Sequence, residues 1–146
     1  MRKESAMNDS GPLTVYTDGA ARGNPGPAAI AYLIFDSQGD VLEKDAKYIG
    51  HRTNNEAEYE ALIWAIERIR ERSCGDVRFY SDSELIVKQV NMAYKTTDRR
   101  MEIYAARVRT NINLFEKFSL EHVRREHPRT QIADKMVNEV LDKEGK

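Results

Sequence analysis

The stretch from Thr14 to Pro27 constrains the fold of this 146-residue chain more than any other. It begins as an alternating, β-rich run that delivers the carboxylate of Asp18, and it then turns through glycines and prolines. An apolar run from Ala28 to Phe35 follows directly. The pattern predicts a β-hairpin whose first strand carries an acid at its end.

The remaining pattern predicts helices alternating with strands. A third strand is expected over residues 41–50, and a long helix begins after Asn55, with Thr53, Asn54 or Asn55 as its cap and an end at residues 73–76. Two further strands are expected at 77–80 and 118–123, and three further helices at 84–90, 101–115 and 132–141. Three strands followed by this alternation predict an α/β fold, a mixed five-stranded sheet flanked by helices.

Composition favours one soluble domain. Residues are 40% hydrophobic and 32% charged, which is ordinary for a globular protein. We expect a single domain over residues 13–143, preceded by a polar, flexible tail at 1–12. Cys74 is the sole cysteine, so no intrachain disulfide forms, and no apolar run approaches the roughly 20 residues of a membrane helix. These features lead us to expect a cytoplasmic monomer without membrane contact.

Three more acids share a context with Asp18. Glu58 falls early in a predicted helix, Asp82 directly follows an apolar strand, and Asp134 enters the last helix. Any one of them alone is typical of a structural or solvated acid, but four acids on separate elements suggest a cation site. Carboxylates suit Mg²⁺, and two such ions roughly 3.5–4 Å apart can position water and stabilise a leaving oxygen in phosphodiester cleavage.

Positive charge gathers in the C-terminal half although the formal net charge is −1. Between Lys88 and Arg109 there are six basic residues against two acids, and a second basic group precedes Asp134. Either group is consistent with solvated surface or with a nucleic-acid contact. The sole tryptophan, Trp64, is expected to pack rather than to bind a ligand.

Four stretches give the chain a resemblance to the type 1 ribonuclease H family, and specifically to its compact, reverse-transcriptase-like branch. They are residues 16–27, 53–62, 80–85 and 133–134, and the resemblance runs from about Leu13 to Leu141. It implies the ribonuclease H-like fold, and it assigns metal binding and catalysis to Asp18, Glu58, Asp82 and Asp134. The expected cofactor is Mg²⁺, as two ions, with Mn²⁺ as a substitute. Glu56 and Glu60 would be accessory or surface acids.

The resemblance also implies endonucleolytic cleavage of the RNA strand of an RNA–DNA hybrid, leaving a 5′-phosphate and a 3′-hydroxyl. Choosing RNA requires sensing of the 2′-hydroxyl by polar groups in the minor groove. Asn24 and Asn54 match family positions that contact the hybrid, and Asn55 is grouped with them. For each asparagine, a structural part in a turn or a helix cap is an equally good interpretation as contact with the hybrid. Thr53 and Arg52 are candidates for phosphate contacts, and Gly23 and Gly26 for close backbone approach.

Two departures from the family separate this chain from many bacterial members. Their catalytic-loop histidine stands ten residues before the last acid, where this chain has Arg124; the nearest histidine, His127, is seven residues before Asp134. His127 would either move a proton or help a metal leave with product, or else be solvated. Arg124, Arg125 and Arg129 are alternatives that contact phosphate. The segment after Gln89 also lacks the lysine-rich, tryptophan-containing extra helix.

Three functions therefore compete. The first is a hybrid-specific ribonuclease. The second is a nucleic-acid-binding module that no longer cuts, which retention of all four acids disfavours. The third is a structure-selective DNA nuclease or a nuclease for double-stranded RNA on the same fold.

Overall fold

The computed structural model describes residues 11–72, 75–92 and 98–146. Its strands are β1 (Leu13–Ala21), β2 (Gly26–Phe35), β3 (Val41–Arg52), β4 (Asp76–Ser81) and β5 (Lys117–His122). Its helices are α1 (Asn54–Arg72), α2 (Glu84–Val90), α3 (Arg99–Ile112) and α4 (Pro128–Lys143). The strands form one sheet in the order β3-β2-β1-β4-β5, so the expected mixed five-stranded sheet flanked by helices is confirmed.

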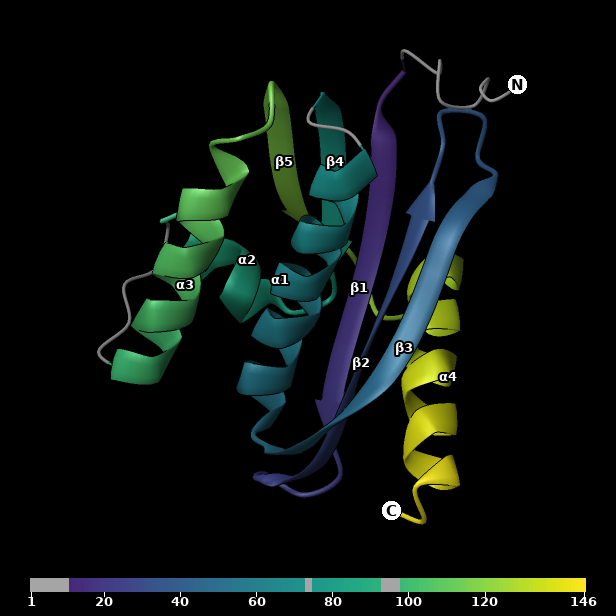
Figure 1. Ribbon diagram of the computed structural model, residues 1–146. Helices are drawn as coiled ribbons and strands as arrows, with labels where there is room; N and C mark the ends of the chain where they lie inside the picture. The colour runs from purple at the N-terminus through teal and green to yellow at the C-terminus, as the bar shows by residue number, and fades with distance from the viewer. Residues whose placement is uncertain (1–10, 73–74, 93–97) are drawn as a thin grey trace.

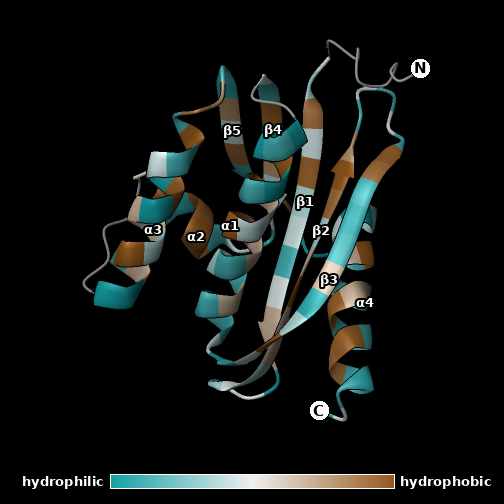
Figure 2. Ribbon diagram, in the orientation of Figure 1, coloured by the Kyte–Doolittle hydropathy of each residue, from teal (hydrophilic) through white to brown (hydrophobic). Residues whose placement is uncertain are grey.

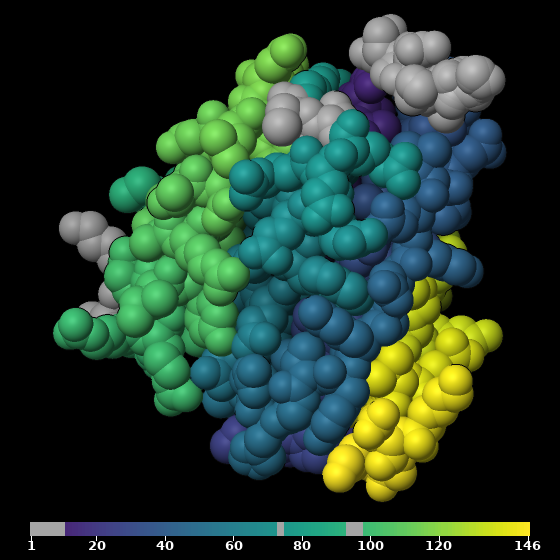
Figure 3. Space-filling model, viewed as in Figure 1, coloured from purple at the N-terminus to yellow at the C-terminus, as the bar shows by residue number. Residues whose placement is uncertain are grey.

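The helices cover both faces of the sheet (Figure 1). Helices α1, α2 and α3 pack on one face around a large apolar cluster that includes Val15, Phe79 and Ile66. Helix α4 lies on the opposite face, where Val137 and Leu141 pack against alanines of β2. The space-filling view shows α3 in green and α4 in yellow on opposite flanks of the molecule (Figure 3).

The adjacent strands β2 and β3 differ in hydropathy, as Figure 2 shows. Strand β2 is almost wholly buried and apolar, because it is covered on both faces. Strand β3 at the edge is largely hydrophilic and partly exposed. Charged side chains on an edge strand discourage pairing with another chain, which fits its position.

The register of β1 with its two neighbours creates the site. Strand β1 pairs antiparallel with β2 along its whole length, from Thr14↔Phe35 to Ala21↔Ala28. Its parallel pairing with β4 ends at Thr17↔Ser81. The next residues of the two parallel strands are Asp18 and Asp82, which therefore meet at the carboxyl ends of adjacent strands. Ligand sites of open α/β sheets form at such ends.

Several expected boundaries were wrong by a few residues. Strand β3 continues to Arg52, beyond the expected end at residue 50. Helix α3 ends at Ile112, and Phe115, which we expected to be helical, is buried in the turn that follows. Helix α4 starts at Pro128 because proline suits the first helical turn and His127 caps it. Asp134 consequently lies in the second turn of α4 rather than at its entry.

Trp64 packs as expected, with its ring edge-on to Tyr32 at 4.8 Å and Lys47 above its face. Residues 1–10 of the expected tail, Ser73 and Cys74 at the expected helix end, and 93–97 of the expected connection lie outside the described residues. No helix in the described ranges is both long enough and apolar enough to span a membrane.

Candidate active site

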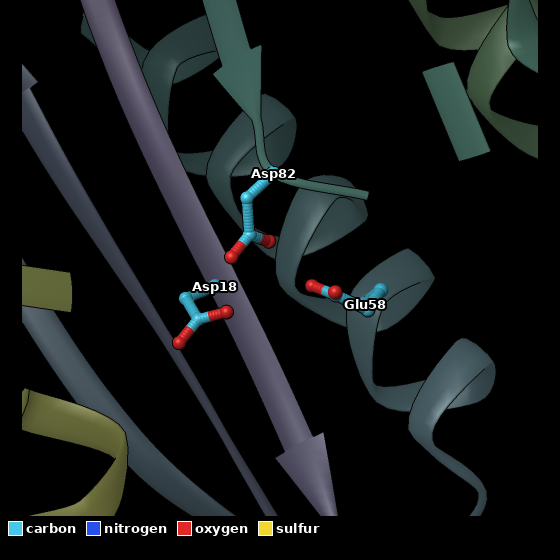
Figure 4. A group of neighbouring side chains, drawn as sticks. All are labelled: Asp18, Glu58 and Asp82. Atoms are coloured by element: carbon cyan, nitrogen blue, oxygen red, sulfur yellow. The ribbon is translucent and has the colours of Figure 1, made fainter. Parts of the chain in front are cut away.

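Three of the four acids come together in space. Carboxylate oxygens of Asp18, Glu58 and Asp82 all lie within 4.8 Å of one another. Figure 4 shows that they come from three different elements, β1, α1 and the segment after β4. They line one cleft of about 420 Å³ together with Asn55, Arg125 and Asp134.

The first turn of α1 fixes the position of Glu58. Thr53 caps the helix: its hydroxyl accepts from the Glu56 N–H at 3.1 Å, while Oε1 of Glu56 accepts from the Thr53 N–H at 2.9 Å. This reciprocal pair is a capping box. It decides which of Thr53, Asn54 and Asn55 is the cap, and it places Glu58 one turn into the helix, facing β1.

Gly19 lets α1 approach β1 closely. A Cβ at this position would lie well under 3.0 Å from the carbonyl oxygen of Ala57, which is backbone and cannot move aside. The Gly19 N–H donates to Oε1 of Glu58 at 3.1 Å. A glycine inside a strand often marks such a close approach, so the signal was present in the sequence although our expectations named only Gly23 and Gly26. Gly26 does approach the backbone of Arg22 closely.

The acids repel one another. Burial, with the negative charges of Asp82 and Asp134, raises the pKa of Asp18 to about 8. Burial and the charges of Asp18 and Asp82 raise the pKa of Glu58 well above its usual value. The pKa of Asp82 is also raised, chiefly by burial, and the nearby Arg125 opposes the rise. A site that disfavours its own negative charge in this way favours a bound cation.

The donor set fits a hard divalent cation. Oδ1 of Asp82 is buried and has no hydrogen-bond partner among the described residues. Buried polar atoms are nearly always satisfied, so an unpartnered carboxylate oxygen beside two other acids is a natural metal ligand. Asp18, Glu58 and Asp82 could therefore hold a metal ion.

Asp134 stands apart from the other three. It is exposed on α4 and lines the same cleft, and its charge raises the pKa values of Asp18 and Asp82. It does not belong to the group of oxygens within 4.8 Å. A part for Asp134 in metal binding or catalysis therefore stays a prediction.

Hydrogen bonds of the Asn24 and Asn54 side chains join the β1–β2 turn to the start of α1. Oδ1 of Asn24 accepts from the Asn54 N–H at 3.0 Å, and Oδ1 of Asn54 accepts from the Ala21 N–H at 2.8 Å. Both side-chain oxygens are thus engaged within the protein, which is the turn-and-cap interpretation. All three asparagines are exposed, and Asn54 and Asn55 line the cleft, whereas Asn24 does not.

Arg52 is engaged as well, because its Nε donates to Oε2 of Glu60 at 2.6 Å and Tyr104 donates to the same oxygen at 2.8 Å. Glu60 therefore links β3 to α3. Of the two alternatives for Glu56, an accessory or a surface acid, the structure excludes the second: only 8% of the residue is exposed, because it completes the capping box and pairs with Arg100 at 3.1 Å.

His127 is held at the start of α4. Its Nδ1 accepts from the Arg129 N–H at 3.1 Å, and its ring stacks on Tyr16 at 5.1 Å. It is not among the residues that line the cleft, so a part in the reaction stays a prediction. Arg129, one of the suggested phosphate contacts, lies over the Phe35 ring at 3.9 Å.

Much of the expected basic surplus is paired. Lys88 contacts Glu84 at 3.2 Å, Arg107 contacts Glu67 at 3.2 Å, and Arg109 donates to the Gln89 carbonyl at 2.9 Å. Lys95 lies outside the described residues. The positive charge available to a ligand on α2 and α3 is therefore smaller than the sequence count suggested.

Two aspartates follow the paired segments of the central strands β1 and β4, α1 adds a glutamate, and α4 carries a fourth acid that lines the same cleft. This arrangement defines the ribonuclease H-like class of proteins. A family described as reverse transcriptase-like matches residues 16–140. The chain therefore belongs to this reverse transcriptase-like family of type 1 ribonuclease H proteins, as the sequence resemblance predicted.

Relatives agree with this assignment. The chain is 37% identical over 132 residues to ribonuclease HI of Halobacterium salinarum, covering 90% of this chain and 65% of that protein. The crystal structure of RNase H1 from the same archaeon superposes with a TM-score of 0.86 at 36% identity, over 91% of this chain and 99% of that one. LC11-RNase H1 from compost, solved in complex with an RNA/DNA hybrid, superposes with a TM-score of 0.84 at 37% identity, over 92% of this chain and 99% of that one.

Some relatives are longer than this chain. It spans just under two thirds of the Halobacterium protein and 35% of a bifunctional protein of Mycobacterium tuberculosis, to which it is 28% identical over 131 residues.

Proposed function

We propose that this protein is a metal-dependent endoribonuclease that hydrolyses the RNA strand of RNA–DNA hybrids and leaves 5′-phosphate and 3′-hydroxyl ends. The convergence of Asp18, Glu58 and Asp82 carries the proposal, because their oxygens lie within 4.8 Å and one Asp82 oxygen is buried without a partner. Carboxylates clustered in this way need a cation, and no nucleophilic side chain is required when water is the attacking group.

Mg²⁺ is the proposed cofactor, as two ions, with Mn²⁺ able to replace it. Asp18, Glu58 and Asp82 would hold the metal, and Asp134 would contribute from the exposed side of the cleft. Bound there, a divalent cation makes water a better nucleophile and stabilises the leaving oxygen. The protein's own part is to fix three acids on three rigid elements, so that little reorganisation is needed when substrate arrives.

The hybrid is proposed as substrate because a close structural relative was solved with one. Asn24, Asn54 and Asn55 are proposed to sense 2′-hydroxyl groups. In support, Asn54 and Asn55 line the cleft and Asn24 is hydrogen-bonded to the Asn54 backbone. Thr53 and Arg52 border the same helix start and are proposed to contact phosphate, with Arg52 exchanging its bond to Glu60. A catalytic part for His127 is also proposed, although its main observed contacts are structural.

A labelled hybrid, a matched DNA duplex and a matched RNA duplex, each with and without Mg²⁺, test the proposal. We expect only the RNA strand of the hybrid to be cut, and only with metal. Comparable cutting of duplex DNA or duplex RNA would support the structure-selective or double-stranded-RNA nuclease. Binding without any cleavage would support a non-cleaving module. That the protein works as a cytoplasmic monomer is a further proposal, which sedimentation and localisation experiments would test.

A further inference from the structure

Arg125 lies over the carboxylate cluster. Its Nε is 3.5 Å from Oδ2 of Asp82. Burial raises the pKa values of Asp18, Glu58 and Asp82, and the positive charge of Arg125 opposes the rise at all three. Among the described residues that line the cleft, it is the one cationic side chain. The positive charge of Arg125 therefore acts on the same three carboxylates that would hold a metal ion.

The two members of this ion pair are very unequally exposed. The Asp82 side chain is 6% exposed, whereas that of Arg125 is 80% exposed. The exposed guanidinium can exchange Asp82 for water or another anion while it stays solvated, so leaving the pair costs Arg125 little. Arg125 can therefore leave Asp82 easily, while Asp82 needs some positive partner.

The backbone around Arg125 is anchored on both sides. The Val123 N–H donates to the Ser81 carbonyl at 2.9 Å, which ties the segment to the end of β4. The His127 N–H donates to the Arg124 carbonyl at 3.0 Å, and His127 caps α4. Only the Arg125 side chain has to rotate for its charge to move from the carboxylates to the mouth of the cleft.

We propose that Arg125 is a resident counter-ion that a divalent cation displaces, and that the displaced guanidinium then binds a phosphate of the nucleic acid in the cleft. Repulsion between the cation and the guanidinium drives the exchange. The planar guanidinium presents donors that match phosphate oxygens. The phosphate half of this inference rests on the proposed function, and the displacement half does not.

Such an exchange couples the two ligands. A phosphate that holds Arg125 away from Asp82 removes a competitor of the cation, so nucleic acid should tighten metal binding. Thermodynamic linkage then requires that metal tighten nucleic-acid binding by the same factor.

Calorimetric titration of the metal-free protein with MnCl₂, without nucleic acid, tests the displacement. Arg125→Ala should bind Mn²⁺ about fivefold or more tightly than wild type, a coupling of ordinary size. Arg125→Lys, which keeps the charge, should fall between the two. Arg124→Ala is the matched control, because it removes an equal charge from the neighbouring exposed position and should match wild type.

Unchanged Mn²⁺ affinity in Arg125→Ala would overturn the displacement, even in an enzyme that cleaves hybrids. Equal gains in the alanine and lysine variants would overturn its electrostatic basis. No Mn²⁺ binding by any of these proteins would overturn the inference together with the metal site.

The phosphate half is tested by fluorescence anisotropy with a hybrid whose RNA strand carries 2′-O-methyl groups that resist cleavage. Mn²⁺ should tighten binding more for wild type than for Arg125→Ala. Equal tightening would overturn this half. If the proposed function is wrong, an unmodified hybrid will stay intact in Mg²⁺. That outcome does not affect the calorimetric test of displacement, which uses no nucleic acid.

Discussion

The backbone N–H of Gly19 donates to Oε1 of Glu58 at 3.1 Å, and this bond joins the acid-bearing strand to the acid-bearing helix. It exists because Gly19 has no Cβ, which lets the backbone of α1 come against β1 at Ala57. The distance between Glu58 and Asp18 is thus set by the residue that follows Asp18.

Gly19→Ala should therefore damage the site and the fold together. The added methyl meets backbone, so α1 must shift, and overpacking of this kind costs about 1–3 kcal/mol. We expect a melting temperature lower by several degrees and weaker Mg²⁺ binding, measured by thermal denaturation and calorimetry. Wild-type values for both quantities would show that α1 does not depend on this glycine for its position.

The four acids should not be equivalent. Asp18→Asn, Glu58→Gln and Asp82→Asn each remove a member of the tight cluster, so each should lower cleavage by more than the roughly 10- to 100-fold typical of outer-shell partners. Asp134→Asn should be milder, because Asp134 is exposed at the edge of the cleft. Steady-state cleavage rates at saturating Mg²⁺ measure this order. An Asp18→Asn enzyme with near-normal turnover would contradict the assignment of the metal site.

The stability of the metal-free protein should fall as pH rises from about 4 to about 8. Over this range the folded protein keeps a proton on Asp18, whose pKa is about 8, while the unfolded chain has lost it near 3.8. The folded state then binds more protons, so the free energy of unfolding decreases with rising pH. Glu58 and Asp82, whose pKa values are also raised, act in the same direction.

Thermal denaturation in chelator at pH about 5.5 and about 8 measures this dependence. Asp18→Asn should be more stable than wild type at the higher pH and should lose part of the pH dependence. Added Mg²⁺ should stabilise wild type at the higher pH, because it binds the folded state and replaces the protons. Equal stability of wild type and Asp18→Asn at both pH values would contradict the raised pKa of Asp18.

His127 should have separable structural and catalytic effects. His127→Ala removes the acceptor for the Arg129 N–H, and loss of a helix cap costs about 0.5–2 kcal/mol. Asparagine is a good cap, so His127→Asn should keep most of the stability. If the imidazole takes part in the reaction, as we predict, His127→Asn should still cleave more slowly. Full activity in a stable His127→Asn would restrict this residue to the cap.

Hybrid affinity should depend weakly on salt. Lys88, Arg100 and Arg107 each have an acid beside them, whose negative charge offsets their attraction for phosphate, so few counterions should be released. We expect a slope of log affinity against log salt of roughly −2 to −4, at about −0.9 per neutralised phosphate. Lys95→Ala combined with Arg99→Ala should make it shallower without abolishing cleavage at saturating substrate. An unchanged slope would move the main contact to the segment at residues 124–129.

The sequence by itself determined the elements and the chemistry of the site. Alternation in residues 13–35 and helical spacing after Asn55 specify strands and a helix through local propensity and burial, which need no knowledge of distant segments. The contexts of Asp18, Glu58 and Asp82 suggested a cation site, and these three acids do lie together. Boundaries shifted where capping decided them, as at Pro128 and Ile112.

Tertiary structure alone decided how these parts meet. It brought oxygens of three acids within 4.8 Å of one another and left Asp134 exposed outside that group. It also buried Glu56 in the capping box and bonded the side chain of Asn24 to the backbone of Asn54. Finally, it placed Arg125 beside Asp82. Each of these outcomes depends on the register between β1 and β4 and on the depth at which α1 and α4 pack. Those quantities follow from side-chain shape and close backbone contact between segments distant in the chain, which local periodicity does not encode.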